Sequence, residues 1–192
     1  MRGQYHRCPF FRIFTDKYRQ IPTNMERLLY DILTNLEEKA AELGLSYVDE
    51  DFGQLEAIDE EGKDTYPLTY PAVLCEVQGV NWSHTDRLQQ EGSATIAVRL
   101  LIDCYDDTHI NSTTTGRILE RSQLNRNLTE TLHGMRILDN SASLTRISSS
   151  SYNGPHLIKV YETVYTAKVW ERFDNDQTAT VRTIRLSGDL KV

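Results

Sequence analysis

The sequence predicts an α+β domain, in which a mainly antiparallel sheet carries two helices on one face. Two long segments, residues 93–105 and 157–173, alternate polar and apolar residues as half-buried strands do. Two further segments, residues 25–43 and about 113–133, repeat apolar residues at helical spacing. These patterns predict the element order α-β-β-α-β-β with long, protruding strands.

The first helix is expected at residues 25–43. Thr23 and Glu26 match a capping box, in which a hydroxyl and a carboxylate satisfy the free backbone amides of a helix start. Gly44 is suited to end the helix. The apolar residues that follow each other at spacings of three and four are Leu28, Leu29, Ile32, Leu33, Leu36, Ala40 and Leu43.

Residues 45–48 are a candidate short strand. A second strand, residues 71–77, is entered through Tyr70 and Pro71, because proline is tolerated at the first position of a strand. The polar stretch from Gly79 to Gly92 is predicted to be a long hairpin connection. It leads into the alternating strand that ends at Tyr105.

The second helix is expected to turn five apolar residues inward and to end before Gly134. These five residues are Ile118, Leu119, Leu124, Leu128 and Leu132. Residues 142–150 form a weaker predicted strand, which dissolves into a serine-rich turn at residues 148–155.

The last strand, residues 157–173, is longer than the usual ~5–6 residues, so one end is predicted to project beyond its sheet as a partner edge. Tyr161, Tyr165 and Trp170 on this strand are candidate interface residues, because large amphipathic rings are enriched at interfaces. The alternative is that they are ordinary strand residues.

A chain of 192 residues favours one domain, assigned to residues 25–173. Residues 1–24 are predicted to be a flexible extension, or to precede a natural start at Met25. Residues 174–192 are predicted to be a tail or an edge strand. No apolar run reaches the ~18 residues of a membrane span, and no signal-peptide core is found, so the prediction is a cytoplasmic protein without a membrane partner.

The net charge of −7 resides in one segment, since residues 49–64 hold eight acids and one base, Lys63. The rest is formally neutral, which does not favour a nucleic-acid-binding domain. The acidic segment is predicted to be a solvated loop or a surface that meets another subunit. Its candidate interface residues are Glu56, Asp59, Glu60, Glu61 and Asp64. Arg117 and Arg121 are candidate complements, or otherwise solvated helix residues.

Catalytic and cofactor patterns are weak in this sequence. The three cysteines, Cys8, Cys75 and Cys104, lack metal-ligand spacing, so Cys75 and Cys104 are expected to be small buried apolar residues. Residues 83–86 are expected to be a surface hairpin, because catalytic triads are assembled from distant segments. No nucleophile elbow or phosphate-binding loop is found, and no cofactor is predicted.

One alternative is a divalent-metal-dependent nuclease or hydrolase. It would use Glu76, Asp103, Asp106 and His109, since carboxylates beside a histidine suit a divalent ion. The competing interpretation is a strand end that passes into a turn, where aspartate caps the next helix. A third class is a module that binds a small ligand between sheet and helices.

The order of elements resembles a family of phage proteins. The helix at residues 25–43, the acidic loop, the strand opening with Tyr70-Pro71-Ala72-Val73 and the strand at residues 94–105 carry the resemblance. The second helix and the strand ending Val169-Trp170-Glu171-Arg172-Phe173 continue it. Over roughly residues 25–173 the chain resembles the tail terminator and tail-completion (head–tail joining) proteins of tailed phages.

That resemblance implies a small α+β subunit without catalytic residues. Such subunits form a ring, commonly a hexamer, on the last ring of the tail tube, where they stop tube growth and present a surface to the head connector. The expected role is a structural protein of virion or prophage assembly. Its expected partners are itself, tail-tube protein and head-connector protein, first in the host cytoplasm and then in the virion. The expected mechanism is the pairing of strand edges and of complementary charges between neighbouring copies.

Overall fold

The computed structural model describes residues 25–59, 68–137 and 143–173. The predicted α+β class is confirmed, with two α-helices and a five-stranded, mostly antiparallel sheet in the described part. The order differs from the predicted one by an additional short strand, which corresponds to the candidate at residues 45–48. The elements are α2 (Met25–Leu43), β1 (Tyr47–Glu50), η1 (Glu56–Asp59), β2 (Ala72–His84), β3 (Gln89–Asp103), α3 (Arg117–Leu132), β4 (Thr145–Asn153), η2 (Pro155–Leu157) and β5 (Ile158–Arg172).

The predictions for residues 1–24 and 174–192 lie outside the described residues. In the described ranges, no helix is both long enough and apolar enough to cross a bilayer.

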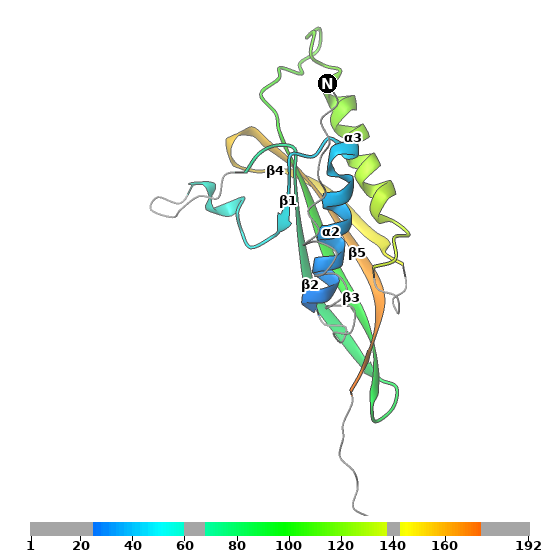
Figure 1. Cartoon of the computed structure of the whole chain (residues 1–192). Helices are drawn as coiled ribbons and strands as arrows, with labels where there is room; N and C mark the ends of the chain where they lie inside the picture. Colours follow the sequence, from blue (N-terminus) through cyan, green and yellow to red (C-terminus); the bar gives the residue numbers. More distant parts are fainter. Residues whose placement is uncertain (1–24, 60–67, 138–142, 174–192) are drawn as a thin grey trace, which may run out of the picture.

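The sheet has the strand order β1-β2-β3-β5-β4 (Figure 1). β1 is parallel to β2, and every other neighbouring pair is antiparallel. β3 and β5 pair along their full length, from Gln89 with Arg172 to Asp103 with Ile158. The central strands therefore hold the sheet together, while the short β1 and the polar β4 lie at its two lateral ends.

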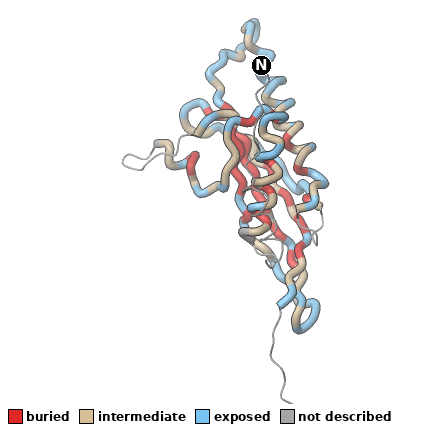
Figure 2. The backbone as a smooth tube through the Cα atoms, in the orientation of Figure 1, coloured by how far each residue is buried: buried red, intermediate tan, exposed pale blue. Residues whose placement is uncertain are grey.

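Three strands continue beyond the rest of the sheet as a ribbon. The pairing of β1 with β2 stops at Cys75, and the pairing of β4 with β5 stops at Thr166. We call this continuation the ribbon. It consists of β2 from Val77 to His84, β3 from Gln89 to Ala94 and β5 from Ala167 to Arg172. It projects past the lower end of α2 in Figure 1. Figure 2 shows that its tip is mainly exposed, in contrast to the buried centre of the sheet.

The ribbon corrects two predictions. The polar stretch from Gly79 to Gly92 is not a long connection, because β2 continues to His84 and β3 begins at Gln89. β5 does project beyond β4, but it is paired with β3 throughout rather than unpaired. The tip of the ribbon has no core to face, so it lacks the apolar alternation on which the prediction depended.

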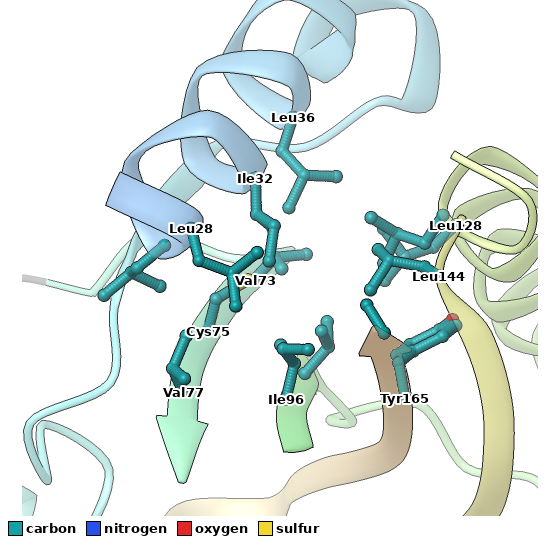
Figure 3. Close-up of a cluster of buried hydrophobic side chains, with 14 of the residues drawn as sticks. Leu28, Ile32, Leu36, Val73, Cys75, Val77, Ile96, Leu128, Leu144 and Tyr165 are labelled. Carbon is teal, nitrogen blue, oxygen red and sulfur yellow. The ribbon is translucent and has the colours of Figure 1, made fainter. Parts of the chain in front are cut away.

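Both helices cover the same face of the sheet, as predicted. Leu28, Ile32 and Leu36 of α2 lie over Val73 and its neighbours (Figure 3). From α3, Leu128 and Leu132 join the same cluster. Cys75 of this cluster is fully buried, and burial raises the pKa of its thiol, which therefore stays protonated. The expectation of a buried apolar cysteine is confirmed there.

α3 begins later than predicted, and its apolar residues pack against the core from Leu124 onward. The residues before Arg117 form turns, in which the hydroxyls of Ser112 and Thr114 bond to the carbonyl oxygen of Asp107. Ile118 is 44% exposed and Leu119 is 75% exposed, so their predicted inward orientation is wrong. Helical spacing alone did not show that this end of the helix extends beyond the sheet.

The other face of the sheet carries a smaller apolar cluster. It lies beneath the segment that joins β1 to η1, from which Leu55 packs against Leu74 and Leu101 of the sheet. β4 is exposed at all nine positions, so both of its faces meet water. The predicted serine-rich turn is wrong for this reason, since residues 148–153 are polar but belong to a strand that pairs with β5.

Candidate assembly interface

One lateral end of the sheet is acidic. β1 is the outermost strand on this side and ends with Asp49 and Glu50, which Asp51 follows directly. Glu56 lies in η1, and its side chain is 59% exposed. We call these four residues the acidic end. Asp59 is the last residue of η1, and the other predicted acidic interface residues, Glu60, Glu61 and Asp64, lie outside the described residues.

A buried arginine holds this segment against the sheet. Arg99, in the middle of β3, donates hydrogen bonds from Nε and Nη2 to the two carboxylate oxygens of Asp51. Its Nη1 donates to Glu56, and also to the hydroxyl of Tyr152 at 3.4 Å. One guanidinium thus connects β3, the η1 segment and β4.

The guanidinium of Arg99 and the carboxylate of Glu56 stabilise each other's charged form. Burial tends to lower the pKa of Arg99, but its hydrogen bonds to Glu56, Asp51 and Tyr152 outweigh this and raise the pKa. The hydrogen bond from Arg99 lowers the pKa of Glu56, against the opposing effect of partial burial of Glu56. One of the predicted interface carboxylates is therefore already bound within its own chain, although half of its side chain still faces water.

Arg99 is not among the site residues predicted from the sequence. The available signal was an arginine within the apolar run that contains Val98 and Leu100. A charge in such a position needs a carboxylate partner, and the only strongly acidic segment of the chain supplies it.

The opposite lateral end of the sheet carries a polar groove of about 640 Å³ between α3 and β4. Here Nε of Arg126 donates to Glu130 at 2.8 Å. Nδ1 of His133 accepts the backbone N–H of Arg146 at 3.3 Å, so in neutral His133 the proton is on Nε2. The groove is lined by Ser122, Asn125, Arg126, Thr129, Glu130, His133 and Arg146.

The arginines that line the groove are not Arg117 and Arg121, which were predicted as the basic complement of the acidic segment. Arg117 lies at the start of α3 and is engaged by Glu120 at 2.6 Å and by Asp106 at 3.4 Å. Arg121 is half-buried, and its Nε has no hydrogen-bond partner in the described part of the chain. Arg126 and Arg146, which the sequence reasoning did not select, are the arginines that line the groove, because the register of β4 brings residue 146 beside α3.

The three predicted aromatic interface residues differ in how far their side chains are exposed. Tyr165 is 1% exposed and belongs to the core, where burial raises its pKa, so it is not a surface residue. Tyr161 is half-buried against the same core. Trp170 is half-buried in the ribbon, opposite Glu91 of β3. A second ribbon tryptophan, Trp82, was not predicted and is 40% exposed.

The alternative metal site does not assemble. Glu76 pairs with Ala97, six residues along β3 from Asp103, which corresponds to about 20 Å of strand. His109 instead contacts the neighbouring Asp107 on the surface, with 2.6 Å between Nδ1 and Oδ1. In the described ranges, no group of three or more His, Cys, Asp or Glu residues is placed to hold a metal ion. The hypothesis based on this cluster is therefore wrong in its geometry.

The polar residues near the ribbon turn have structural partners. Ser83 Oγ donates to the carbonyl oxygen of Glu91 at 3.0 Å. Asp86 Oδ1 accepts the backbone N–H of Leu88 at 2.7 Å, as is usual for aspartate in a turn. These contacts fit the predicted surface hairpin.

Comparison with known proteins finds distant likeness among solved structures. No family model matches the chain, and no curated protein matches it in sequence. Among solved structures, a chain of the virion of a native gene transfer agent (GTA) particle is similar, with a TM-score of 0.44 and 10% sequence identity. The similarity covers 71% of this chain and 90% of that chain.

Proposed function

We propose that this chain is a structural protein of a phage or phage-like virion. In this proposal it associates with copies of itself into a ring that caps the tail tube and joins it to the head connector. The observation that carries the proposal is the ribbon, which projects beyond both lateral strands of its own sheet. The resemblance of residues 25–173 to tail terminator proteins supplies the biological setting.

The ribbon offers two strand edges. Both outer strands of the ribbon pair with β3, but in the described ranges neither the outer edge of β2 from Val77 to His84 nor that of β5 from Ala167 to Arg172 has a second strand partner. Such edges present unpaired backbone N–H and C=O groups, which readily accept another strand. Since β2 and β5 both run antiparallel to β3, the β2 edge of one copy and the β5 edge of the next form a parallel pair when all copies point the same way.

Two features of the ribbon favour controlled rather than open-ended pairing. A bulge between Val77 and Gly79 interrupts the regular register at the start of the β2 edge. On the β5 edge, Lys168 forms an ion pair with Glu91 of β3 and keeps a charge on the ribbon surface. Bulges and edge lysines are devices by which natural sheets restrict pairing to the intended partner.

The contact is head-to-tail, because it joins two different surfaces of the same subunit. Repetition of such a contact gives a closed ring if the rotation between neighbours closes, and a filament if it does not. A ring fits the proposed role, since a tail tube ends in a ring-shaped face.

The test uses the full chain with and without tail-tube protein of the same virion. We expect backbone amides of the two ribbon edges to become protected from hydrogen exchange as protein concentration rises, while the helices keep their protection. Electron microscopy should show tubes that end in an additional density and stop growing when the protein is added. Unchanged exchange at both edges together with unchanged tube growth would refute the proposal.

A further inference from the structure

We propose that the groove between α3 and β4 receives the acidic end of a neighbouring copy, with Arg146 of one subunit opposite Glu50 of the next. This inference rests on the proposed self-association and identifies the charge contact that orders the subunits. It replaces Arg117 and Arg121, the candidates that the sequence offered, by arginines that the fold places at the end of the sheet opposite the acidic end.

The groove is suited to bind carboxylates. Within the described ranges, the guanidinium of Arg146 has no hydrogen bond or ion pair, although its own backbone is fixed by His133. Arg126 is exposed, and its one ion pair among the described residues is with Glu130 of the same helix. Hydroxyl and amide groups of Ser122, Asn125 and Thr129 complete a polar lining. Guanidinium groups bind carboxylates through paired hydrogen bonds, so an acidic side chain is the matching partner.

The acidic end has an excess of charge to offer. Glu50 is exposed, and no described cation contacts its carboxylate. Asp49 accepts hydrogen bonds from the Tyr47 hydroxyl and from a backbone amide, which leaves its negative charge without a described cation. In the sequence, Lys63 is the one base among residues 49–64. Residues 117–146, in contrast, contain five arginines and three acids.

The register places the two charges at matching heights on opposite sides of the sheet. Glu50 is level with Cys75 of β2, and Arg146 is level with Tyr165 of β5. Tyr165 is in turn level with Val77, through Ile96 of β3. The two levels are therefore two strand positions apart, about 7 Å, which is within the reach of an arginine and a glutamate side chain.

The two residues also share a face. Glu50 is opposite Cys75, and Arg146 is opposite Tyr165; both of these partners are buried on the helix-covered face. Asp49 is opposite Leu74, which belongs to the other face. Glu50 is thus the residue of β1 whose position matches the groove, because side chains alternate between the two faces along a strand.

The charge contact and the strand contact both require the neighbour on the same side and in the same orientation. The open edge of β2 lies on the same side of the sheet as β1, and the open edge of β5 lies on the same side as β4. In a copy set beside its neighbour in the same orientation, the β2 side of one copy therefore faces the β5 side of the next, and Glu50 lies on the side that faces Arg146. The two independent features agree on direction, which favours a second copy as the occupant.

Charge reversal in the full chain tests this contact. Glu50→Lys and Arg146→Glu are each expected to raise the concentration at half-assembly by at least about tenfold, because each places like charges together. The double variant restores the pairing in swapped form and is expected to assemble within about threefold of the wild type. An equimolar mixture of the two single variants should co-assemble, since in alternation every contact is again of opposite charge.

Matched controls separate this contact from general charge effects. Glu37→Lys alters an exposed residue of α2, and Arg117→Glu alters the other end of α3; both are expected to assemble like the wild type. Circular dichroism and thermal unfolding establish that every variant is folded. If the wild type assembles and the two single reversals assemble equally well, this contact is wrong and the self-association remains. If the wild type does not assemble at any concentration, the self-association fails and this contact fails with it.

Discussion

Arg99 and Asp51 form a two-point ion pair between the middle strand of the sheet and the segment that follows its shortest strand. The side chains are 11% and 9% exposed, so the pair is nearly withdrawn from water. The pair therefore has a positional role, because it holds the η1 segment, which carries Glu56, on the helix-free face.

Replacement of Arg99 by methionine should destabilise the protein strongly. Arg99→Met preserves the aliphatic stem but leaves the carboxylate of Asp51 buried without its partner, and loss of one member of a buried pair costs about 3–5 kcal/mol. Urea unfolding followed by circular dichroism measures the change. Arg99→Lys keeps the charge but loses the two-point geometry, so it should be intermediate. A loss below about 1 kcal/mol for Arg99→Met would show that this pair does not hold the segment.

The bond between Glu56 and Arg99 should weaken in acid. Because the pKa of Glu56 is lowered in the folded protein, its contribution is present above the ordinary carboxylate pKa of about 4.3 and is lost as the pH falls through the lower folded value. Wild type should therefore be more stable than Glu56→Gln at neutral pH, and the difference should shrink below pH ~4. Unfolding free energies measured between neutral and acid pH test this. A difference that grows in acid contradicts the sign.

Gly92 gives room to Trp82 in the ribbon. A Cβ atom at position 92 would lie 2.5 Å from Val80 Cγ1 and 2.7 Å from Trp82 Cε3, so Gly92→Ala must displace these side chains. We expect a loss of about 1–3 kcal/mol and a red shift of tryptophan emission, measured with Trp170→Phe in both proteins. Gly79→Ala is the matched control, because a Cβ there has no neighbour within 4 Å. Equal effects at both glycines would contradict the packing described for Trp82.

The two halves of α3 should respond differently to truncation. Leu128 is 3% exposed, so Leu128→Ala should cost about 2–5 kcal/mol through lost burial and a residual cavity. Leu119 is 75% exposed, and Leu119→Ala should change stability by less than about 0.5 kcal/mol. Chemical denaturation of the two variants in parallel gives the comparison. A large loss for Leu119→Ala would mean that the start of α3 is covered by another part of the chain or by another copy.

The sequence predicted elements best where both caps and an apolar stripe mark them. α2 was predicted at the bounds it has, because Leu28, Ile32 and Leu36 face a core and Gly44 ends the helix with a positive φ of 71°. β4 and the ribbon were missed for one physical reason. Both faces of β4 and of the ribbon tip are mainly exposed, so the apolar alternation that reveals a half-buried strand is absent there.

The candidate interface was predicted only in part, because it depends on register. The acidic segment is evident from composition, but the position of Arg146 beside α3 follows from the pairing of β4 with β5, which the serine-rich sequence does not indicate. Tyr165 shows the converse error. Its aromatic ring suggested an interface, yet it lies on the alternating face that the helices cover.

Native mass spectrometry of the full chain over a series of concentrations tests self-association most directly. We expect monomer in equilibrium with one closed oligomer of fixed subunit number, because a head-to-tail contact that closes leaves no free end. A monomer at every concentration, or a continuous ladder of sizes without a preferred closed state, would contradict the ring.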